Sequence, residues 1–306
     1  MKYNLVVFGV KDTSENIIKF IEDNLCSVDL IITIDEKVVN RNNISGYKGL
    51  DEIAQKYGIP LYKADSYELT DIKTQEFISN NNFDIGISMG WQRLVPVSVL
   101  SAFKYGIYGF HGNCGYLPFG RGRSPLNWSI INGDTRFNLN LFRYDEKADS
   151  PNVFATEMFS ITEHDDIRTA QYKNMICSKN LIRRLIKAYQ SGRIEIRTDS
   201  KDFDSWYNKR TAKDGKIDFH DRTRNIYNLI RGVAAPFPGA FAFVGDKRVT
   251  IWQAHPFDEI IDFSMYAPGE VVDIFDGRLV VRTLDGSLLI DKYECDFEIS
   301  AGDILA

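Results

Sequence analysis

The chain has 306 residues, which predicts about two domains of ordinary size. Hydrophobic residues make up 44% and charged residues 26%; these values are typical of a globular protein with a substantial core and exclude a disordered or fibrous chain. The 37 lysines and arginines face 42 acidic residues, a net charge of −5. This balance argues against a dedicated nucleic-acid partner, although a local basic patch would still be compatible with one.

Cysteine and histidine usage points to an ordinary reducing environment. The four cysteines and four histidines are scattered without any zinc-type spacing, so we expect free thiols and no metal. The apolar run at the start of the chain soon meets Lys11 and Asp12, and it is too short for a signal peptide or a membrane span. We therefore expect a cytoplasmic protein with no membrane partner.

The first third of the chain alternates short apolar strands with amphipathic helices. Ser14 is the expected N-cap of the first helix, and Gly58 is expected to end a later one. The rhythm predicts a Rossmann-like, doubly wound and mostly parallel sheet. The first strand–helix turn lacks both the dinucleotide fingerprint and the P-loop, which disfavours a hydride-transfer enzyme or an ATPase. Strands are expected over 5–8, 28–34, 59–61 and 83–88, and helices over 50–57 and 72–78.

The last third of the chain reads as a separate small β-rich domain. A polar stretch over 198–215 is expected to be a linker, and a helix is expected over 226–230. Short strands joined by Asp-Gly or Gly-Asp turns then predict a small barrel. The expected strands are 241–244, 248–252, 269–274, 279–283 and 288–290. We place the boundary between a catalytic domain, 1–205, and a β-barrel-like domain, 206–306.

The segment 104–134 is the most informative part of the sequence because it is crowded with Gly, Pro, Arg and one His. We expect a long loop at the carboxyl edge of the parallel sheet, where open α/β sheets bind ligands. His111 stands between Gly109 and Gly112. The glycines would permit close approach of a substrate, and imidazole suits proton transfer near neutral pH. The alternative is a connection that merely turns the chain.

Several different short motifs follow one another along most of the chain, and their order and spacing are informative. They are His111-Gly112, Leu117-Pro118, Arg121-Gly122-Arg123, Pro125–Trp128 and Asn132–Asp134, then 213–218, 226–231, 238–241 and 269–272. Together they resemble the 10-formyltetrahydrofolate-dependent formyltransferases, and most of all the nucleotide-sugar N-formyltransferases. The resemblance implies a formyltransferase-fold, Rossmann-like domain followed by an OB-like domain. It also implies transfer of a formyl group from 10-formyltetrahydrofolate to a nucleotide-linked amino sugar, a precursor of lipopolysaccharide, O-antigen or another bacterial surface glycan.

The same resemblance implies catalytic residues. His111 matches the family's His, and Asp149 matches its Asp, with a solvated loop acid as the alternative. The family's Asn-x-His pattern places Gly109 at the position of the Asn. Asn113 either supplies the missing amide donor from the other side of His111 or only supports a tight turn.

Binding residues follow from the resemblance in the same way. Met89, Gly90, Trp91, Leu94 and Val95 would form a pterin pocket for the folate, with plain core packing as the alternative for the Trp91 side chain. Arg121 and Arg123 would meet the phosphates of the sugar nucleotide unless they are solvated or structural. Tyr207 and Arg210, with Trp206, are weaker candidates for base stacking or phosphate contact.

Two other functions stay open. One is a methionyl-tRNA formyltransferase, which the acidic balance and the apparent lack of a basic insertion disfavour. The other is a catalytically altered binding relative, suggested only by Gly109. A homodimer through the C-terminal region is compatible with the resemblance, and the strand Val249–Trp252 would then be either an exposed edge or part of the core.

Overall fold

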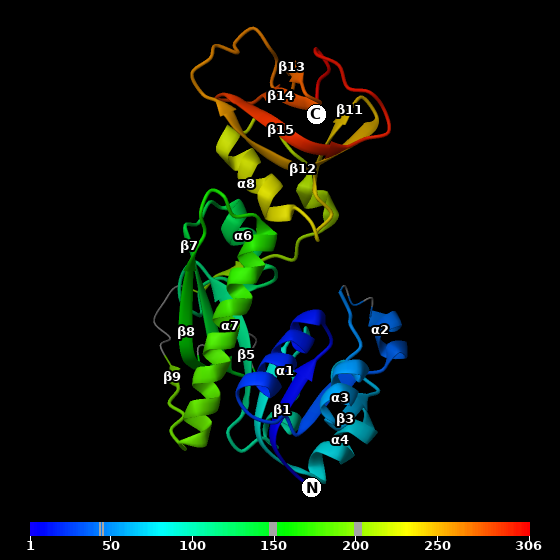
Figure 1. Ribbon diagram of the computed structural model, residues 1–306, viewed down its shortest axis with the longest axis vertical. Helices are drawn as coiled ribbons and strands as arrows, with labels where there is room; N and C mark the ends of the chain where they lie inside the picture. The colour runs from blue at the N-terminus through cyan, green and yellow to red at the C-terminus, as the bar shows by residue number, and fades with distance from the viewer. Residues whose placement is uncertain (43, 45, 147–151, 199–203) are drawn as a thin grey trace. The chain divides into compact units, whose positions relative to one another are not determined.

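The computed structural model describes residues 1–42, 44, 46–146, 152–198 and 204–306 (Figure 1). These residues divide into two compact units. The first consists of Met1–Arg121, Asn138–Met158 and Asn174–Ser205, and the second of Gly122–Phe137, Phe159–Lys173 and Trp206–Ala306. None of the four cysteines forms a disulfide. Among the described residues, no helix is both long and apolar enough to cross a membrane.

The first unit is built on a mostly parallel sheet, which confirms the predicted fold class. Its strand order is β3-β2-β1-β4-β5-β7-β8-β9. The five strands from β3 to β5 run parallel, whereas β7 is antiparallel to β5 and β9 to β8. The bounds are β1 Lys2–Gly9, β2 Leu30–Ile34, β3 Leu61–Ala64, β4 Asn82–Met89, β5 Ile107–Asn113, β7 Arg136–Arg143, β8 Asn152–Ser160 and β9 Arg197–Thr198.

Apolar runs explain the central strands of this sheet. Every residue of β2 is buried, so both of its faces are covered. Gly58 adopts the left-handed conformation, φ 67°, and ends α3 where the sequence predicted. The helices are α1 Asp12–Asn24, α2 Glu36–Asn42, α3 Asp51–Tyr57, α4 Ile72–Ser79, α5 Val97–Leu100, α6 Pro125–Ile131 and α7 Ile167–Gln190 (Figure 1).

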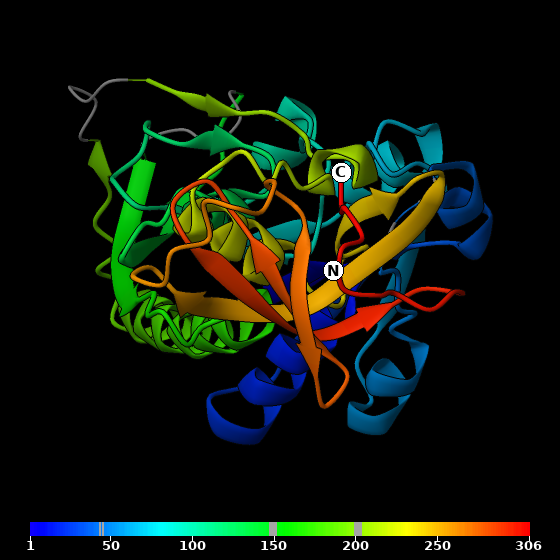
Figure 2. The same cartoon turned by 90° about the horizontal axis from the view of Figure 1, so that it is seen from above.

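The second unit contains a five-stranded antiparallel sheet of order β11-β12-β15-β14-β13, strongly twisted in Figure 2. Ile226 and Ile230 of α8, Thr223–Val233, are buried together with Val249 and Ile251 of the sheet. This confirms the β-rich C-terminal region. The strands are β11 Ala240–Val244, β12 Lys247–Asp258, β13 Val271–Phe275, β14 Arg278–Arg282 and β15 Ser287–Glu294.

One open alternative for this region is decided, and one expectation is corrected. Val249–Trp252 is the interior alternative and not the edge, because β12 pairs with β11 on one side and β15 on the other. The stretch 198–215, expected to be a linker, contains regular structure. Trp206–Tyr207 forms the strand β10, and Ala212–Gly215 forms a 3₁₀ turn in which Gly215 is buried. The polar composition did not reveal the strand β10, because the backbone hydrogen bonds of a strand do not depend on its side chains.

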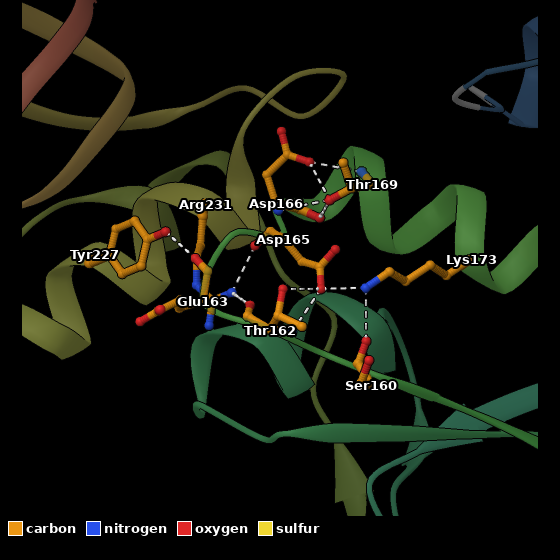
Figure 3. Close-up of polar contacts among 9 residues, drawn as sticks. All are labelled: Ser160, Thr162, Glu163, Asp165, Asp166, Thr169, Lys173, Tyr227 and Arg231. Carbon is orange, nitrogen blue, oxygen red and sulfur yellow. Dashed lines mark hydrogen bonds and ion pairs between the residues drawn. The ribbon is translucent and has the colours of Figure 1, made fainter.

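Within the second unit, an ion pair between a half-buried lysine and a buried aspartate ties the segment 160–173 together (Figure 3). The Asp165 side chain is 7% exposed and lies 2.5 Å from Lys173 Nζ. It also accepts hydrogen bonds from the Thr162 backbone at 2.7 Å and the Thr162 hydroxyl at 2.9 Å. Burial alone would raise the pKa of Asp165, but the bonds from Lys173 and Thr162 outweigh it and hold the pKa below its ordinary value.

We expect this carboxylate to make the fold sensitive to acid. A lowered pKa in the folded state stabilises the protein above the unfolded pKa, and this contribution is lost as pH falls through the folded pKa. Asp165→Asn should therefore lower the free energy of unfolding by about 2 kcal/mol at pH 7, and by progressively less toward pH 3. Denaturant titrations across this pH range measure the difference.

Asp166→Asn is the matched control, because the half-buried Asp166 caps the backbone of Thr169 and asparagine caps equally well. A difference between Asp165→Asn and the wild type that stays constant from pH 7 to pH 3 would contradict the assignment.

Candidate functional site

The carboxyl ends of three parallel strands meet at one edge of the first unit. Gly9 at the end of β1 is in register with Met89 at the end of β4. The next strand, β5, runs parallel to β4 from Ile107 and ends at Asn113. Open α/β sheets bind ligands at this edge, so residues that follow these strand ends are candidates for a site.

Ser14 holds two of these strand ends together, a role that differs from the predicted N-cap. Helix α1 begins at Asp12, so Ser14 lies in its first turn, where its Oγ accepts the Lys11 N–H at 3.2 Å. The same hydroxyl donates to the carbonyl of Met89 at 2.6 Å. A Cβ on Gly9 would lie 2.3 Å from the Ser14 Cβ, so glycine is required there for the close approach.

His111 lies on a strand and not in a loop, which corrects the sequence prediction. Its strand, β5, is paired with β7, and His111 is directly opposite Asn140. The side chain is 8% exposed, and Nε2 lies 2.7 Å from the carbonyl oxygen of Gly120. Because a carbonyl oxygen only accepts, Nε2 carries the proton, and the lone pair of the neutral ring is on Nδ1. The glycines on either side misled the prediction, since they usually mark loops.

A buried polar face surrounds His111. Residues paired across antiparallel strands, and residues two apart along a strand, share one face of a sheet. His111 and Asn113 of β5 and Asn138 and Asn140 of β7 therefore point to the same side. Thr156 donates to Asn140 Oδ1 at 2.7 Å. All three asparagines have no exposed area. Burial of so many polar groups is costly unless they are hydrogen-bonded.

The contacts of Asn113 are those of a turn-supporting residue. Its amide nitrogen donates to the carbonyl of Phe119, and its Oδ1 accepts the N–H of Gly115 at 2.6 Å. Asn138 Nδ2 donates to the carbonyl of Gly115 at 2.6 Å. These bonds fix the loop that follows β5, as Asn commonly does in tight turns. A role of Asn113 as donor to a substrate stays a prediction.

The segment predicted to hold folate follows β4. Met89 and Val95 are buried, and Gly90 adopts a positive φ of 77° beside Ser14. Trp91 is 8% exposed and packs at 4.9 Å, edge to face, against Tyr67. The Trp91 ring therefore packs in the core, while its Nε1–H has no hydrogen-bond partner among the described residues. Leu94 is 62% exposed.

The arginines predicted to meet phosphate differ in their surroundings. In the first unit the Arg121 side chain is 13% exposed, with its guanidinium 3.3 Å from Asp204. In the second unit Arg123 is exposed, and its backbone N–H donates to the carbonyl of Tyr207 at 3.1 Å. Gly122 lacks the Cβ that would lie 2.4 Å from that same carbonyl oxygen. Arg121 thus faces an acidic partner, whereas Arg123 lies on the surface.

Two weaker candidates, Tyr207 and Arg210, come together on Trp128, a residue that sequence reasoning had quoted only as part of a motif. The Tyr207 and Trp128 rings stack at 6.0 Å with an angle of 14°. The Arg210 guanidinium lies 5.0 Å from the centre of the Trp128 ring and donates to the carbonyl of Asp214 at 2.7 Å. Burial lowers the pKa of Arg210. A small cavity of about 140 Å³ beside Arg210 is lined in part by Ser124 and Asn127.

Asp149, predicted as the catalytic acid, lies outside the described residues. In the part of the chain that the structure describes, no group of three or more His, Cys, Asp or Glu side chains is placed to hold a metal ion.

Comparisons with known proteins define the class of this protein. Residues 209–303 match the family model of the formyl transferase C-terminal domain. The bifunctional polymyxin resistance protein ArnA of Wigglesworthia glossinidia brevipalpis is 30% identical over 219 residues, 71% of this chain. The chain spans only 32% of the length of that protein. These matches assign the C-terminal region of the chain to the formyl transferase family, and make most of the chain similar to ArnA.

Solved structures share its fold along nearly its whole length. WlaRD, a sugar 3N-formyl transferase solved in the presence of dTDP and 5-N-formyl-THF, matches with a TM-score of 0.68 and 17% identity over 97% of this chain and 99% of its own. An N-formyltransferase from Helicobacter canadensis, in complex with folinic acid and dTDP-3-aminofucose, matches with a TM-score of 0.66, 17% identity and 98% of both chains. This particular chain is thus similar to the sugar N-formyltransferases in fold.

Proposed function

We propose that the chain is a cytoplasmic N-formyltransferase that moves a formyl group from 10-formyltetrahydrofolate to the amine of a nucleotide-linked amino sugar, in the synthesis of a bacterial surface glycan. The observation that carries this proposal is His111, held by Gly120 on a buried polar face at the carboxyl edge of the sheet. The family match and the sugar N-formyltransferase neighbours support the reaction class and the kind of acceptor.

The chemistry needs a proton acceptor near the attacking amine. The amine adds to the formyl carbon and becomes an ammonium group, so a base must remove its proton and the leaving folate nitrogen must gain one. Because Nε2–H donates a hydrogen bond to the Gly120 carbonyl, the neutral imidazole of His111 has its basic lone pair on Nδ1. We assign the proton transfer to His111 and retain Asp149 as its proposed partner.

The segment 89–95 is our candidate for the folate. Among the described residues the Trp91 Nε1–H is a buried donor without a hydrogen-bond partner, and buried donors of this kind call for an acceptor. Leu94 adds an exposed apolar side chain to the same segment. A planar pterin combines an apolar face with acceptors at its edge, so these residues suit it.

The test is direct transfer. The purified protein is incubated with 10-formyltetrahydrofolate and a panel of dTDP-, UDP- and GDP-linked amino sugars, and the products are followed by mass spectrometry. We expect one sugar nucleotide to gain a formyl group. Transfer to none of the panel would favour a binding relative, and formylation of methionyl-tRNA would instead assign the chain to the tRNA branch.

For the nucleotide, we expect Arg210 to contribute a charged contact. Arg210→Met should weaken binding of the reactive nucleotide by about tenfold, because a hydrogen bond to a charged group is worth about 1.5–3 kcal/mol. Titration calorimetry with the free nucleoside diphosphate measures the change. Lys209→Met, at the exposed neighbouring position, is the control. Equal dissociation constants for the two variants would show that Arg210 does not contact the nucleotide.

A further inference from the structure

The space beside Gly109 is filled by the side chain of Tyr144. A Cβ built on Gly109 would lie 2.1 Å from the Tyr144 hydroxyl oxygen and 2.2 Å from the nearest ring carbon. No side chain larger than hydrogen fits there while Tyr144 keeps its position. The phenol therefore occupies the place toward which a side chain at residue 109 would project.

This place lies on the polar face of His111. Gly109 precedes His111 by two positions on β5, so both residues point to the same side of the sheet. Tyr144 directly follows β7, and its backbone N–H donates to the carbonyl of Ile107 at 2.8 Å. Its ring also contacts Phe142, which pairs with Gly109, at 5.3 Å between centroids. Backbone and ring contacts thus fix where the hydroxyl lies.

The three asparagine side chains of this face are poorly suited to meet a substrate. Asn113 is fully buried, with both ends of its amide bonded to the loop that follows β5. Asn138 and Asn140 are also fully buried. The Asn138 nitrogen donates to Gly115, and the Asn140 oxygen accepts from Thr156. Tyr144 is half-buried, so it is more exposed than these three asparagines.

We propose that the Tyr144 hydroxyl is the hydrogen-bond donor that stabilises the tetrahedral oxyanion of formyl transfer, with the bare Gly109 making room for it. The proposal rests on the proposed function. When the amine adds to the formyl carbon, a C–N bond forms and the carbonyl π electrons move to oxygen as a negative charge. Tyr144 donates its O–H to that oxygen and keeps its proton.

The same bond serves the collapse of the intermediate. The oxygen electrons re-form the C=O bond, and the bond from the formyl carbon to the folate nitrogen breaks. The amine loses one proton, which His111 accepts, and the folate nitrogen gains one. A donor aimed at the developing charge contributes to kcat and not to ground-state binding.

Tyr144→Phe tests the hydroxyl alone, because the ring that fills the space at Gly109 stays. We expect kcat to fall by about 100-fold with little change in KM, as for removal of one oxyanion donor. The thermal unfolding midpoint should stay close to that of the wild type. Tyr108→Phe is the matched control, since Tyr108 is on the same strand but faces the opposite side, where its hydroxyl donates to the carbonyl of Tyr105. It should keep wild-type kcat.

A reciprocal exchange separates a chemical role from a packing role. Tyr144→Ala should be as slow as Tyr144→Phe, and adding Gly109→Asn to Tyr144→Ala should restore about tenfold, because the new amide enters the vacated space. Wild-type kcat in Tyr144→Phe would overturn the assignment of Tyr144 and leave the proposed function standing. A wild-type protein that transfers formyl to no acceptor would overturn both.

Discussion

Replacing His111 with glutamine should lower kcat for formyl transfer by about 1,000-fold, within the range contributed by a positioned general base. Glutamine carries an N–H that can replace Nε2–H in the bond to the Gly120 carbonyl, so the loop that follows β5 stays anchored. What it lacks is a group that accepts and releases a proton near neutral pH. The loss should therefore appear in kcat, measured at saturating concentrations of both substrates, while the unfolding midpoint changes little.

His255→Gln is the control for this experiment. His255 is on β12, its side chain is 51% exposed, and its Nδ1 lies 2.7 Å from Asp291. It has the same chemistry as His111 but no place on the polar face, so its replacement should leave kcat unchanged. If the kcat of His111→Gln equals that of His255→Gln, another group removes the ammonium proton, and the assignment of His111 as the base is wrong.

The fold was predictable where hydrophobic periodicity is strong. The runs of β2 and β4 and the Gly58 stop of α3 are local signals, and each element lies near its predicted place. β5 was missed because its glycines resemble a loop, although one of them, Gly109, gives room to the Tyr144 side chain. The alternating asparagines and leucines of Arg136–Arg143 carried a strand signal that we did not use.

The candidate site was predictable only in part for a different reason. His111 could be singled out by its residue type and its resemblance to a family pattern, and both arise from a short segment. The contact of Tyr144 with Gly109 depends on the register of β5 against β7, which no local pattern specifies. The bond from Ser14 to Met89 likewise joins distant segments through the parallel pairing of β1 and β4. Register and pairing, more than residue type, decide which polar groups meet.

The largest loss of stability should follow Arg231→Met in the second unit. Arg231 is 8% exposed on α8, and its guanidinium donates to the carbonyls of Thr162 at 2.8 Å and Asp165 at 2.7 Å (Figure 3). It also donates to Asn228 Oδ1 at 2.9 Å. Burial lowers the pKa of Arg231, although a guanidinium stays charged in proteins. Methionine fills similar space but leaves three acceptors, two of them buried, without their donor, which should cost about 3 kcal/mol in the free energy of unfolding.

Arg224→Met on the same helix separates this network from a simple loss of positive charge. The Arg224 side chain is 53% exposed and lies 3.8 Å from Glu163, and an exposed pair of this kind is worth less than about 1 kcal/mol. In denaturant unfolding, Arg231→Met should therefore have a clearly lower free energy of unfolding than Arg224→Met and the wild type. Hydrogen exchange should show the loss at 162–165 and along α8, because Arg231 of α8 donates directly to Thr162 and Asp165. Equal unfolding free energies for the two variants would mean that water replaces the guanidinium at no cost, and the network would then contribute nothing to holding the segment 162–165 on α8.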